Sequence, residues 1–295
     1  MGEDSKIILN GKLIPETEGN ILVTSRGLLY GDGCFETFRA YQGRFLGIRS
    51  HLKRLSEGLN YLSIEYPEGL RENFLNVQLR SLLETNNLID KDVIIRIQVW
   101  RKGTRGYKVE TNLAGYSITA TPIQKEPAAY KLATVDVKRV PSAAVPARFK
   151  LSNGINYIKA AGQAVQQDAD DALLETVEHF VSETTIANIF WLKKQSVFTP
   201  SLDCDILPGV TRAICLNLLR NHLNKEVIEG AFTINDIKEA EAVWICNSIK
   251  EIQPISCIDE TVFNVHHDFI QLLIKEFKAY RERKLLKLKS DKKNR

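Results

Sequence analysis

The sequence predicts an α+β protein of two domains. Its 295 residues are 44% hydrophobic and 26% charged, which excludes a disordered chain and provides enough apolar residues for two cores. Strand-like and helix-like segments are interspersed without a repeating strand–helix–strand rhythm, which disfavours a parallel sheet. Residues 124–129 (QKEPAA) are polar and contain a proline, as linkers often do. We therefore expect a small domain over 1–123, this linker, a larger domain over 130–287 and a basic tail over 288–295.

The first domain should open with a β-hairpin. Asn10-Gly11, a pair that suits a type I′ turn, lies between the apolar runs KIIL and KLI. Residues 31–41 are expected to form a strand that begins near two glycines. Residues 44–48 should return beside that strand, because a Gln-Gly turn separates the two segments.

Two helices and two strands should complete this domain. The first helix is expected behind Ser50 as its N-cap. Its apolar face would consist of Leu52, Leu55, Leu59 and Leu62. The second helix covers roughly residues 69–86. The strands are expected at 93–100, where alternation gives one fully apolar face, and at 115–123.

The second domain should combine strands, a hairpin and three helices. A proline-punctuated loop at 140–150 separates its first strand from a helix rich in small residues. The expected strands are 130–137, 172–177, 179–182, the hairpin 188–200, and 242–247. The expected helices are 155–169, one that opens at 207–212, and 263–287. The last helix should pack through Phe269, Leu272, Leu273, Phe277 and Tyr280.

The net charge of +4 comes from the end of the chain. Forty Lys and Arg oppose 36 Asp and Glu overall, whereas residues 281–295 alone hold eight basic and two acidic residues, or +6. The other residues therefore sum to 4 − 6 = −2. A nucleic-acid binder would spread its basic residues over the fold. We expect a solvated terminus and no nucleic-acid partner.

Targeting and metal signals are missing from the sequence. No run of about eighteen apolar residues could span a bilayer, and the first residues lack a basic region followed by an apolar core. The five cysteines are never spaced as CxxC, so we expect reduced, packed thiols in a cytoplasmic protein with no membrane partner. His266 and His267 are adjacent and would point in different directions on a helix, so no metal site is expected. The cysteines are Cys34, Cys204, Cys215, Cys246 and Cys257.

Four features could together carry chemistry. Residues 207–212 (LPGVTR) open an apolar helical run and could offer backbone N–H groups to a phosphate, although Thr211 could equally serve as a helix cap. Arg54 lies off the leucine face of its helix, Glu183 lies between apolar strand segments, and Lys150 ends the proline-containing loop. Pyridoxal phosphate requires a lysine amine, an anionic partner for its ring nitrogen and a cationic phosphate cup. A nucleophile triad fits worse, because no Ser or Cys stands in a recognisable activating setting.

Several motifs, taken in order, resemble those of the class IV aminotransferases. They run from about residue 10 to residue 255 and include RG, YGDGCFETFRAYQG, HLKRL, SETTIANIFW, FTPSLD, LPGVTR and ICNSIKEIQPI. The resemblance implies a fold-type IV pyridoxal phosphate enzyme of the D-amino acid aminotransferase type, with a small N-terminal α/β domain and a larger, barrel-like mixed α/β domain. It also implies a homodimer whose active site is completed across the interface. Branched-chain and D-amino acid aminotransferases and aminodeoxychorismate lyase would be relatives.

The resemblance also implies the cofactor-binding residues. Lys150 would be the Schiff-base lysine and, once freed, the general base and acid for the substrate's α-proton. Lys159 lies nine residues too late for the register that the ADDALL segment sets, and it is expected to be an ordinary helix lysine. Glu183 would keep the pyridine nitrogen protonated. The phosphate would be bound by Arg54, Val210, Thr211 and Ser248.

The substrate-binding residues are implied by position. Residues 100–107 (WRKGTRGY) fall where family members place groups for the substrate carboxylate. The pattern of D-amino acid aminotransferases, Pro-Arg with a His two residues later, is not met, because Thr104 precedes Arg105 and Tyr107 stands at the His position. The tyrosine near the cofactor's phenolic oxygen would be Tyr157 or Tyr30. The substrate-binding candidates are Arg105, Tyr107, Lys250 and Tyr30.

These residues lead us to expect a pyridoxal 5′-phosphate enzyme that transfers an amino group between a small amino acid and a 2-oxo acid. The alternative is 4-amino-4-deoxychorismate lyase, which releases pyruvate and p-aminobenzoate, because the GDGCFET, RGY and ICN motifs are more lyase-like than branched-chain-like. A more distant alternative is a protein that binds the cofactor or nucleic acid without turnover.

Overall fold

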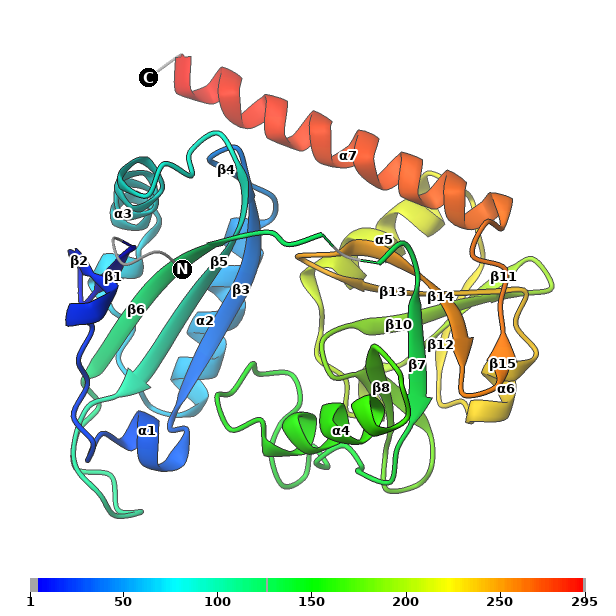
Figure 1. Ribbon diagram of the computed structural model, residues 1–295, viewed down its shortest axis with the longest axis horizontal. Helices are drawn as coiled ribbons and strands as arrows, with labels where there is room; N and C mark the ends of the chain where they lie inside the picture. Colours follow the sequence, from blue (N-terminus) through cyan, green and yellow to red (C-terminus); the bar gives the residue numbers. More distant parts are fainter. Residues whose placement is uncertain (1–4, 126, 294–295) are drawn as a thin grey trace. The chain divides into compact units, whose positions relative to one another are not determined.

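The computed structural model describes residues 5–125 and 127–293, with side chains through Leu285. The chain forms two compact units (Figure 1). The first contains residues 5–124, Phe149–Asn153 and 287–293, and the second contains Lys125–Arg148 and Gly154–Leu286. The chain leaves the first unit after Gln124, where the expected linker begins. Residues 149–153 differ from the expected division, because they hydrogen-bond to a strand of the first unit.

The first unit is built on a six-stranded sheet with the order β2-β1-β6-β5-β3-β4, in which neighbouring strands are antiparallel. The predicted opening hairpin is confirmed. Asn10 and Gly11 both have positive φ, 50° and 83°, as a type I′ turn requires. The strands are β1 (Lys6–Leu9), β2 (Lys12–Pro15), β3 (Gly33–Tyr41), β4 (Arg44–Phe45), β5 (Asp92–Arg101) and β6 (Ala114–Pro122).

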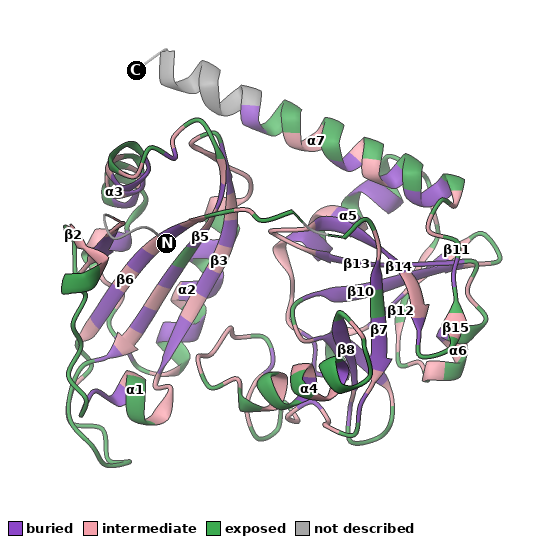
Figure 2. Ribbon diagram, viewed as in Figure 1, coloured by how far each residue is buried: buried purple, intermediate pink, exposed green. Residues whose placement is uncertain are grey.

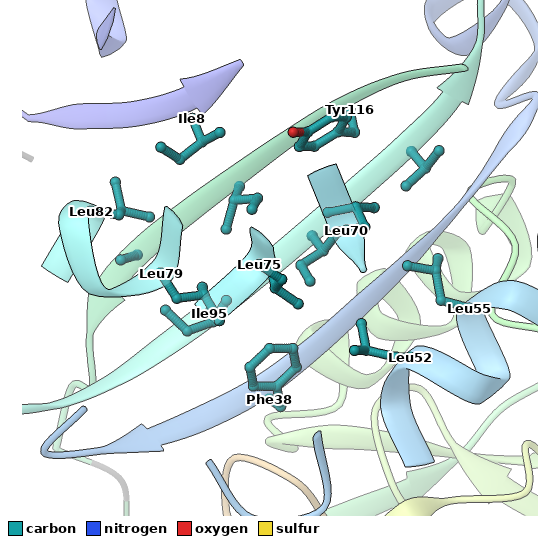
Figure 3. Close-up of a cluster of buried hydrophobic side chains, with 14 of the residues drawn as sticks. Ile8, Phe38, Leu52, Leu55, Leu70, Leu75, Leu79, Leu82, Ile95 and Tyr116 are labelled. Carbon is teal, nitrogen blue, oxygen red and sulfur yellow. The ribbon is translucent and has the colours of Figure 1, made fainter. Parts of the chain in front are cut away.

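Leucine-rich helices cover one face of this sheet. The helices α2 (Ile48–Tyr61) and α3 (Glu72–Thr85) place their leucines against strand residues such as Phe38 and Ile95 (Figure 3). The predicted apolar face of the 93–100 strand is confirmed, because alternate residues of β5 are fully buried. They are Val93, Ile95, Ile97 and Val99. Each such side chain contributes about 2 kcal/mol by leaving water, so the sheet is a firm support for the residues on β3.

Two local predictions for this unit were wrong, and one short helix was missed. The first long helix begins at Ile48 behind Gly47 (φ 70°), so Ser50 lies within its first turn and is not the N-cap. The strand expected at 44–48 is therefore reduced to the two residues of β4. The short helix α1 (Arg26–Tyr30) was not predicted, because five residues are too few to show a helical period.

The second unit is built on a nine-stranded mixed sheet. Its order is β12-β11-β10-β13-β14-β7-β8-β9, with β15 paired to β14. β7 runs parallel to both β14 and β8, and β11 runs parallel to β12. The strands are β7 (Tyr130–Thr134), β8 (Asp171–Glu175), β9 (Val181–Thr184), β10 (Asn188–Lys193), β11 (Ser196–Pro200), β12 (Val227–Gly230), β13 (Ala242–Asn247), β14 (Glu251–Ile258) and β15 (Thr261–Val262).

This second sheet is curled. β9 stands last in the hydrogen-bonded order, yet it also contacts β10 and β11 near the other end. The curl encloses a core that includes the buried residues Trp191, Ile245 and Ile255. The strands β10, β13 and β14 that carry them are largely buried (Figure 2). The predicted barrel-like mixed domain and the α+β class are therefore confirmed. All five cysteines are free, and four of them are buried.

Helices pack around the curled sheet. They are α4 (Ile155–Gln166), α5 (Val210–Asn221), α6 (Ile234–Lys238) and α7 (Asp268–Lys293). The last helix begins at Asp268, not near 263, because the chain before it forms β15 and a turn. Phe269, Leu273 and Phe277 are buried as predicted, but Leu272 is 43% exposed, since it lies off the i, i+4 stripe of the other three. The side chains of the expected basic tail, 288–295, lie outside the described residues, and its backbone is helical through Lys293.

Candidate functional site

Lys150 lies on a short segment that is hydrogen-bonded to β3. Leu151 forms an isolated bridge with Cys34, and the Phe35 N–H donates to the Lys150 carbonyl at 3.0 Å. The half-buried Lys150 amine lies 4.6 Å from the centroid of the Phe35 ring. Its backbone is therefore held as in a strand, although the sequence suggested only the end of a loop. Lys159, in contrast, is exposed on α4.

Arg54 is buried in an ion-pair cluster with Glu36 and His51. Its Nε and Nη2 donate to Oε1 and Oε2 of Glu36 at 2.7 and 2.8 Å, and His51 Nδ1 is 2.7 Å from Oε2. Burial acts to raise the pKa of Glu36, but Arg54 and then His51 outweigh it and hold that pKa at about 2. The carboxylate is therefore permanently ionised near neutral pH and fixes the plane of the guanidinium.

Glu36 and His51 were missed by the sequence reasoning. Alternation along β3 was the available signal, because it puts Glu36 on the same buried face as Cys34 and Phe38. A carboxylate on a buried face requires a cationic or donating partner. Arg54 was assigned only to a phosphate, so its pairing within the first unit went unpredicted.

Glu183 is buried in β9, where four groups surround its carboxylate. Oε1 accepts a hydrogen bond from the Tyr157 hydroxyl at 2.9 Å, and Arg139 Nη2 lies 3.5 Å away. Oε2 accepts from Asn188 Nδ2 at 3.1 Å and from the Leu207 N–H at 2.9 Å. Burial, and then the neighbouring carboxylate, raise the pKa of Tyr157, so the tyrosine stays a hydrogen-bond donor.

The start of α5 forms a second cluster in this unit. Gly209 is its N-cap and Val210 its first residue, with no capping side chain. The alternative in which Thr211 caps the helix was therefore wrong: its hydroxyl oxygen lies 3.2 Å from that of Ser248. Ser248 follows β13, so a helix start and a strand end bring two hydroxyl groups together. Backbone N–H groups and hydroxyls in this arrangement suit a phosphate.

Lys250 belongs to the turn that follows Ser248. Asn247 Oδ1 accepts from the N–H groups of Ile249 and Lys250 at 2.9 and 2.8 Å, which fixes the turn. The Lys250 amine donates to the Tyr130 hydroxyl at 2.5 Å. Within the second unit, Lys250 is thus attached to β7 by its side chain while its backbone adjoins the hydroxyl pair.

The segment proposed for the substrate carboxylate is anchored to α1 in the first unit. The Gly106 N–H donates to the Tyr30 hydroxyl at 2.7 Å, and the rings of Tyr30 and Tyr107 have centroids 5.3 Å apart. Tyr107 is 90% exposed and Arg105 is exposed. The structure therefore brings Tyr30 and Tyr107 together and leaves Arg105 at the surface of this unit.

Two buried arginines that the sequence reasoning missed hold this segment in place. Arg26 and Arg101 both donate through Nε to Asp32 Oδ2, at 2.7 and 2.9 Å. Arg26 also donates to the carbonyl of Gly106, and Arg101 to that of Thr111 at 3.2 Å. The RG and GDG motifs supply Arg26 and Asp32, so the motif was noticed but its part in anchoring the segment was not.

Two further features are absent from the described residues, a metal-binding group and a membrane-spanning helix. No group of three His, Cys, Asp or Glu side chains there could hold a metal ion. No helix in that part of the chain is long and apolar enough to cross a membrane.

Comparison with known proteins identifies the family. The family model for amino-transferase class IV matches residues 33–258, which is more than half of the chain. The chain belongs to the class IV aminotransferases. The match includes Lys150, Glu183, Thr211 and Ser248, and the resemblance inferred from the motifs is confirmed.

Its relatives include transaminases and a lyase. A Methanocaldococcus jannaschii protein named "Putative branched-chain-amino-acid aminotransferase" is 33% identical over 265 residues, covering 88% of this chain and 90% of its own. The Bacillus subtilis aminodeoxychorismate lyase is 27% identical over 263 residues, covering 86% and 87%. A Thermoproteus uzoniensis branched-chain aminotransferase solved with norvaline has a TM-score of 0.86 at 26% identity, with 93% of each chain covered. This class IV aminotransferase is therefore an enzyme, and the transaminase prediction is better supported than the lyase.

Proposed function

We propose that this class IV aminotransferase uses pyridoxal 5′-phosphate to transfer an amino group between a small amino acid and a 2-oxo acid. The observation that carries the proposal lies within the second unit. A buried carboxylate, Glu183, is hydrogen-bonded to Leu207, and the same loop leads into the hydroxyl pair of Thr211 and Ser248. A short loop thereby links a carboxylate suited to a protonated ring nitrogen with a group of donors suited to a phosphate.

The residues of this loop fit a phosphate. Gly209 has an ordinary φ of −64°, so its conformation does not require glycine. A Cβ at this position would lie 2.2 Å from Asn188 Oδ1, so glycine is required because there is no space for a side chain. The helix start has no capping side chain, and its first N–H groups lie next to two hydroxyls, which together are the usual donor set for a phosphate. Arg54, with its plane fixed by Glu36, is proposed as the cationic partner.

The chain's own residues would then divide the work. When bound, the cofactor serves as an electron sink for the bond to the substrate's α-hydrogen. Glu183 holds a proton at the ring nitrogen, because a buried carboxylate favours the charged form of its partner. Lys150, as the free amine, would take the α-proton from the substrate and deliver it to the C4′ carbon of the cofactor. Phe35 and the strand-like backbone limit the positions that the Lys150 side chain can adopt.

We assign substrate recognition to four residues. Arg105 would bind the substrate carboxylate through its guanidinium, with Tyr107 beside it and Tyr30 supporting the segment through Gly106. Lys250 is a cation in the turn after Ser248 and is suited to an acidic substrate group or to the phosphate.

We also propose a homodimer. A contiguous stretch of the first unit exposes large apolar side chains, more than isolated surface residues would explain. These are Ile21, Leu22, Val23, Leu28 and Leu29. A second copy that covered them would place α1 in the interface, with the Tyr30 anchor at its edge, in keeping with a site completed by both chains. Five free cysteines fit a reducing compartment such as the cytoplasm.

The lysine is tested first. Lys150→Ala should abolish the visible absorbance of lysine-bound cofactor and lower turnover by about 10² to 10⁴-fold, the usual contribution of a general base. Lys159→Ala, which changes an exposed lysine on α4, is the matched control and should leave both unchanged. A colourless wild-type protein that cannot be reconstituted with pyridoxal phosphate would overturn the proposal.

The lyase is the second candidate, favoured by the similarity to the Bacillus subtilis enzyme over most of both chains. Two parallel assays separate the reactions. Holoenzyme is given aminodeoxychorismate in one and an amino acid with 2-oxoglutarate in the other. We expect oxoglutarate-dependent turnover. Release of p-aminobenzoate and pyruvate without it would reverse the ranking.

A further inference from the structure

One buried amide links the two ends of the proposed cofactor site. Asn188 is the first residue of β10, is 5% exposed and pairs with Cys246 on β13. Its Nδ2 donates to Glu183 Oε2 at 3.1 Å and to the Leu207 carbonyl at 2.9 Å. Both hydrogens of the amide nitrogen are therefore used, one on the carboxylate and one on the loop.

The other face of the same side chain is packed against the helix start. Oδ1 of Asn188 is the atom that a Cβ on Gly209 would meet, at 2.2 Å. Glu183 is also bonded directly to the loop, because Oε2 accepts from the Leu207 N–H at 2.9 Å. Glu183, Asn188 and Leu207 thus close a ring of three hydrogen bonds, and Gly209 rests against it.

We propose that Asn188 is a positioning residue that sets the carboxylate of Glu183 and the phosphate-binding loop relative to each other. The inference rests on the proposed function of these two groups. A cofactor with a ring nitrogen at one end and a phosphate at the other has a fixed length, so the two protein groups must keep a fixed separation. The amide fixes that separation by bonding to both groups in a place that excludes water.

The chemistry of the position calls for an amide. An alanine would remove one donor from Oε2 and one from the Leu207 carbonyl, and buried acceptors that lose a partner are costly. An aspartate would keep the shape but place a second carboxylate about 3.1 Å from Glu183. Two carboxylates at so short a distance share a proton. Glu183 in its protonated form could no longer hold a cation at the ring nitrogen.

The test uses cofactor-free full-length protein and two separate probes. Inorganic phosphate, followed by calorimetry, reports the loop. Pyridoxal, which lacks the phosphate, is followed by its visible absorbance on Lys150 and reports the ring end. Asn188→Ala should weaken the binding of both probes about tenfold, whereas Thr211→Ala should weaken the binding of phosphate alone. Asn188→Asp should weaken pyridoxal further than alanine does, and because it preserves the side-chain shape it carries the test if the alanine variant does not fold.

Asn86→Ala is the matched control. The Asn86 side chain also makes two hydrogen bonds, accepting from the Lys6 N–H and donating to the Lys6 carbonyl, but both lie in the first unit. This substitution should lower the free energy of unfolding by a similar amount and leave the binding of both probes unchanged. The inference is overturned if Asn188→Ala behaves like Asn86→Ala, or if it weakens one probe only. A wild-type protein that binds neither probe would instead overturn the proposed function, and the inference with it.

Discussion

At the scale of single residues, each unit holds a buried carboxylate beside predicted site residues, Glu36 in the first unit and Glu183 in the second, and the two differ in their partners. Glu36 faces a guanidinium and a histidine, while Glu183 faces a tyrosine, an amide, a backbone N–H and, at 3.5 Å, Arg139. Glu36 has a strongly lowered pKa. A carboxylate in a bidentate ion pair is a strong structural contact, so Glu36 serves mainly to hold Arg54.

This pairing makes a prediction about stability and pH. The pKa of Glu36 falls from its ordinary 4.5 to about 2 on folding, a difference worth about 3 kcal/mol. A lowered pKa stabilises the fold above the unfolded value and loses that contribution as pH falls from about 4.5 toward 2. Glu36→Gln should therefore be destabilised by about 3 kcal/mol or more at pH 7, since it also leaves Arg54 buried without its counter-charge.

Urea unfolding at pH 7, 4 and 3 measures this effect. The difference in the free energy of unfolding between wild type and Glu36→Gln should become smaller as the pH falls. Glu84→Gln removes an exposed pair with Arg80 of the same 2.7 Å length and should cost under about 0.5 kcal/mol. A gap that stays constant with pH would show that the Glu36 charge adds no stability of its own.

At the scale of elements, the sequence predicted the elements with a strong period and missed those set by tertiary contacts. The alternation of β5 and the turn at Asn10 are local properties, and both were predicted correctly. The five-residue α1 and the strand-like pairing of Leu151 with β3 depend on distant partners that no local pattern contains. The start of α2 was misplaced because Gly47, with its positive φ, begins the helix before Ser50 does.

The start of α5 gives a prediction at this scale. Gly209→Ala places a methyl group 2.2 Å from Asn188 Oδ1, so we expect a loss of about 1 to 3 kcal/mol from overpacking. In an Asn188→Ala background that oxygen is gone, and the further cost of Gly209→Ala should fall below about 1 kcal/mol. Arg212 Cβ, at 3.2 Å, accounts for the remainder. Chemical denaturation of the four proteins completes the cycle.

Gly162 provides the control for that cycle. It lies inside α4, and an added Cβ would meet nothing within 4 Å. Gly162→Ala should stabilise the protein by up to about 1 kcal/mol, because alanine is the better helix former. Additive costs for Gly209→Ala and Asn188→Ala would contradict the packing contact between Gly209 and the Asn188 amide.

At the scale of the whole molecule, the motifs identified the family and the residue types, while the structure added the network that holds them. Lys150, Glu183, Thr211 and Ser248 could be named as candidates from sequence because their motifs are specific in order and spacing. Glu36, Asn188, Arg26 and Arg101 could not be given roles, because each role is a hydrogen bond to a group far along the chain. Asn188 even lies within the SETTIANIFW motif, yet only the fold brings it to Leu207.

The exposed apolar stretch of the first unit carries the last prediction. Leu22 and Val23 are 76% and 77% exposed, and a stable dimer usually buries about 800 Å² per partner around such residues. A Leu22→Glu, Val23→Glu double variant would force two charges into that contact. We expect it to run as a monomer in light scattering, and to lose turnover if both chains complete the site.

Val77→Glu distinguishes loss of the interface from loss of surface apolarity in general. Val77 is 70% exposed on α3, away in sequence from the stretch at 21–29, and its substitution should leave a dimer with normal turnover. A wild-type protein that is monomeric at micromolar concentration would refute the homodimer outright. A double variant that is monomeric yet fully active would keep the dimer and refute the shared site, because each chain would then suffice for catalysis.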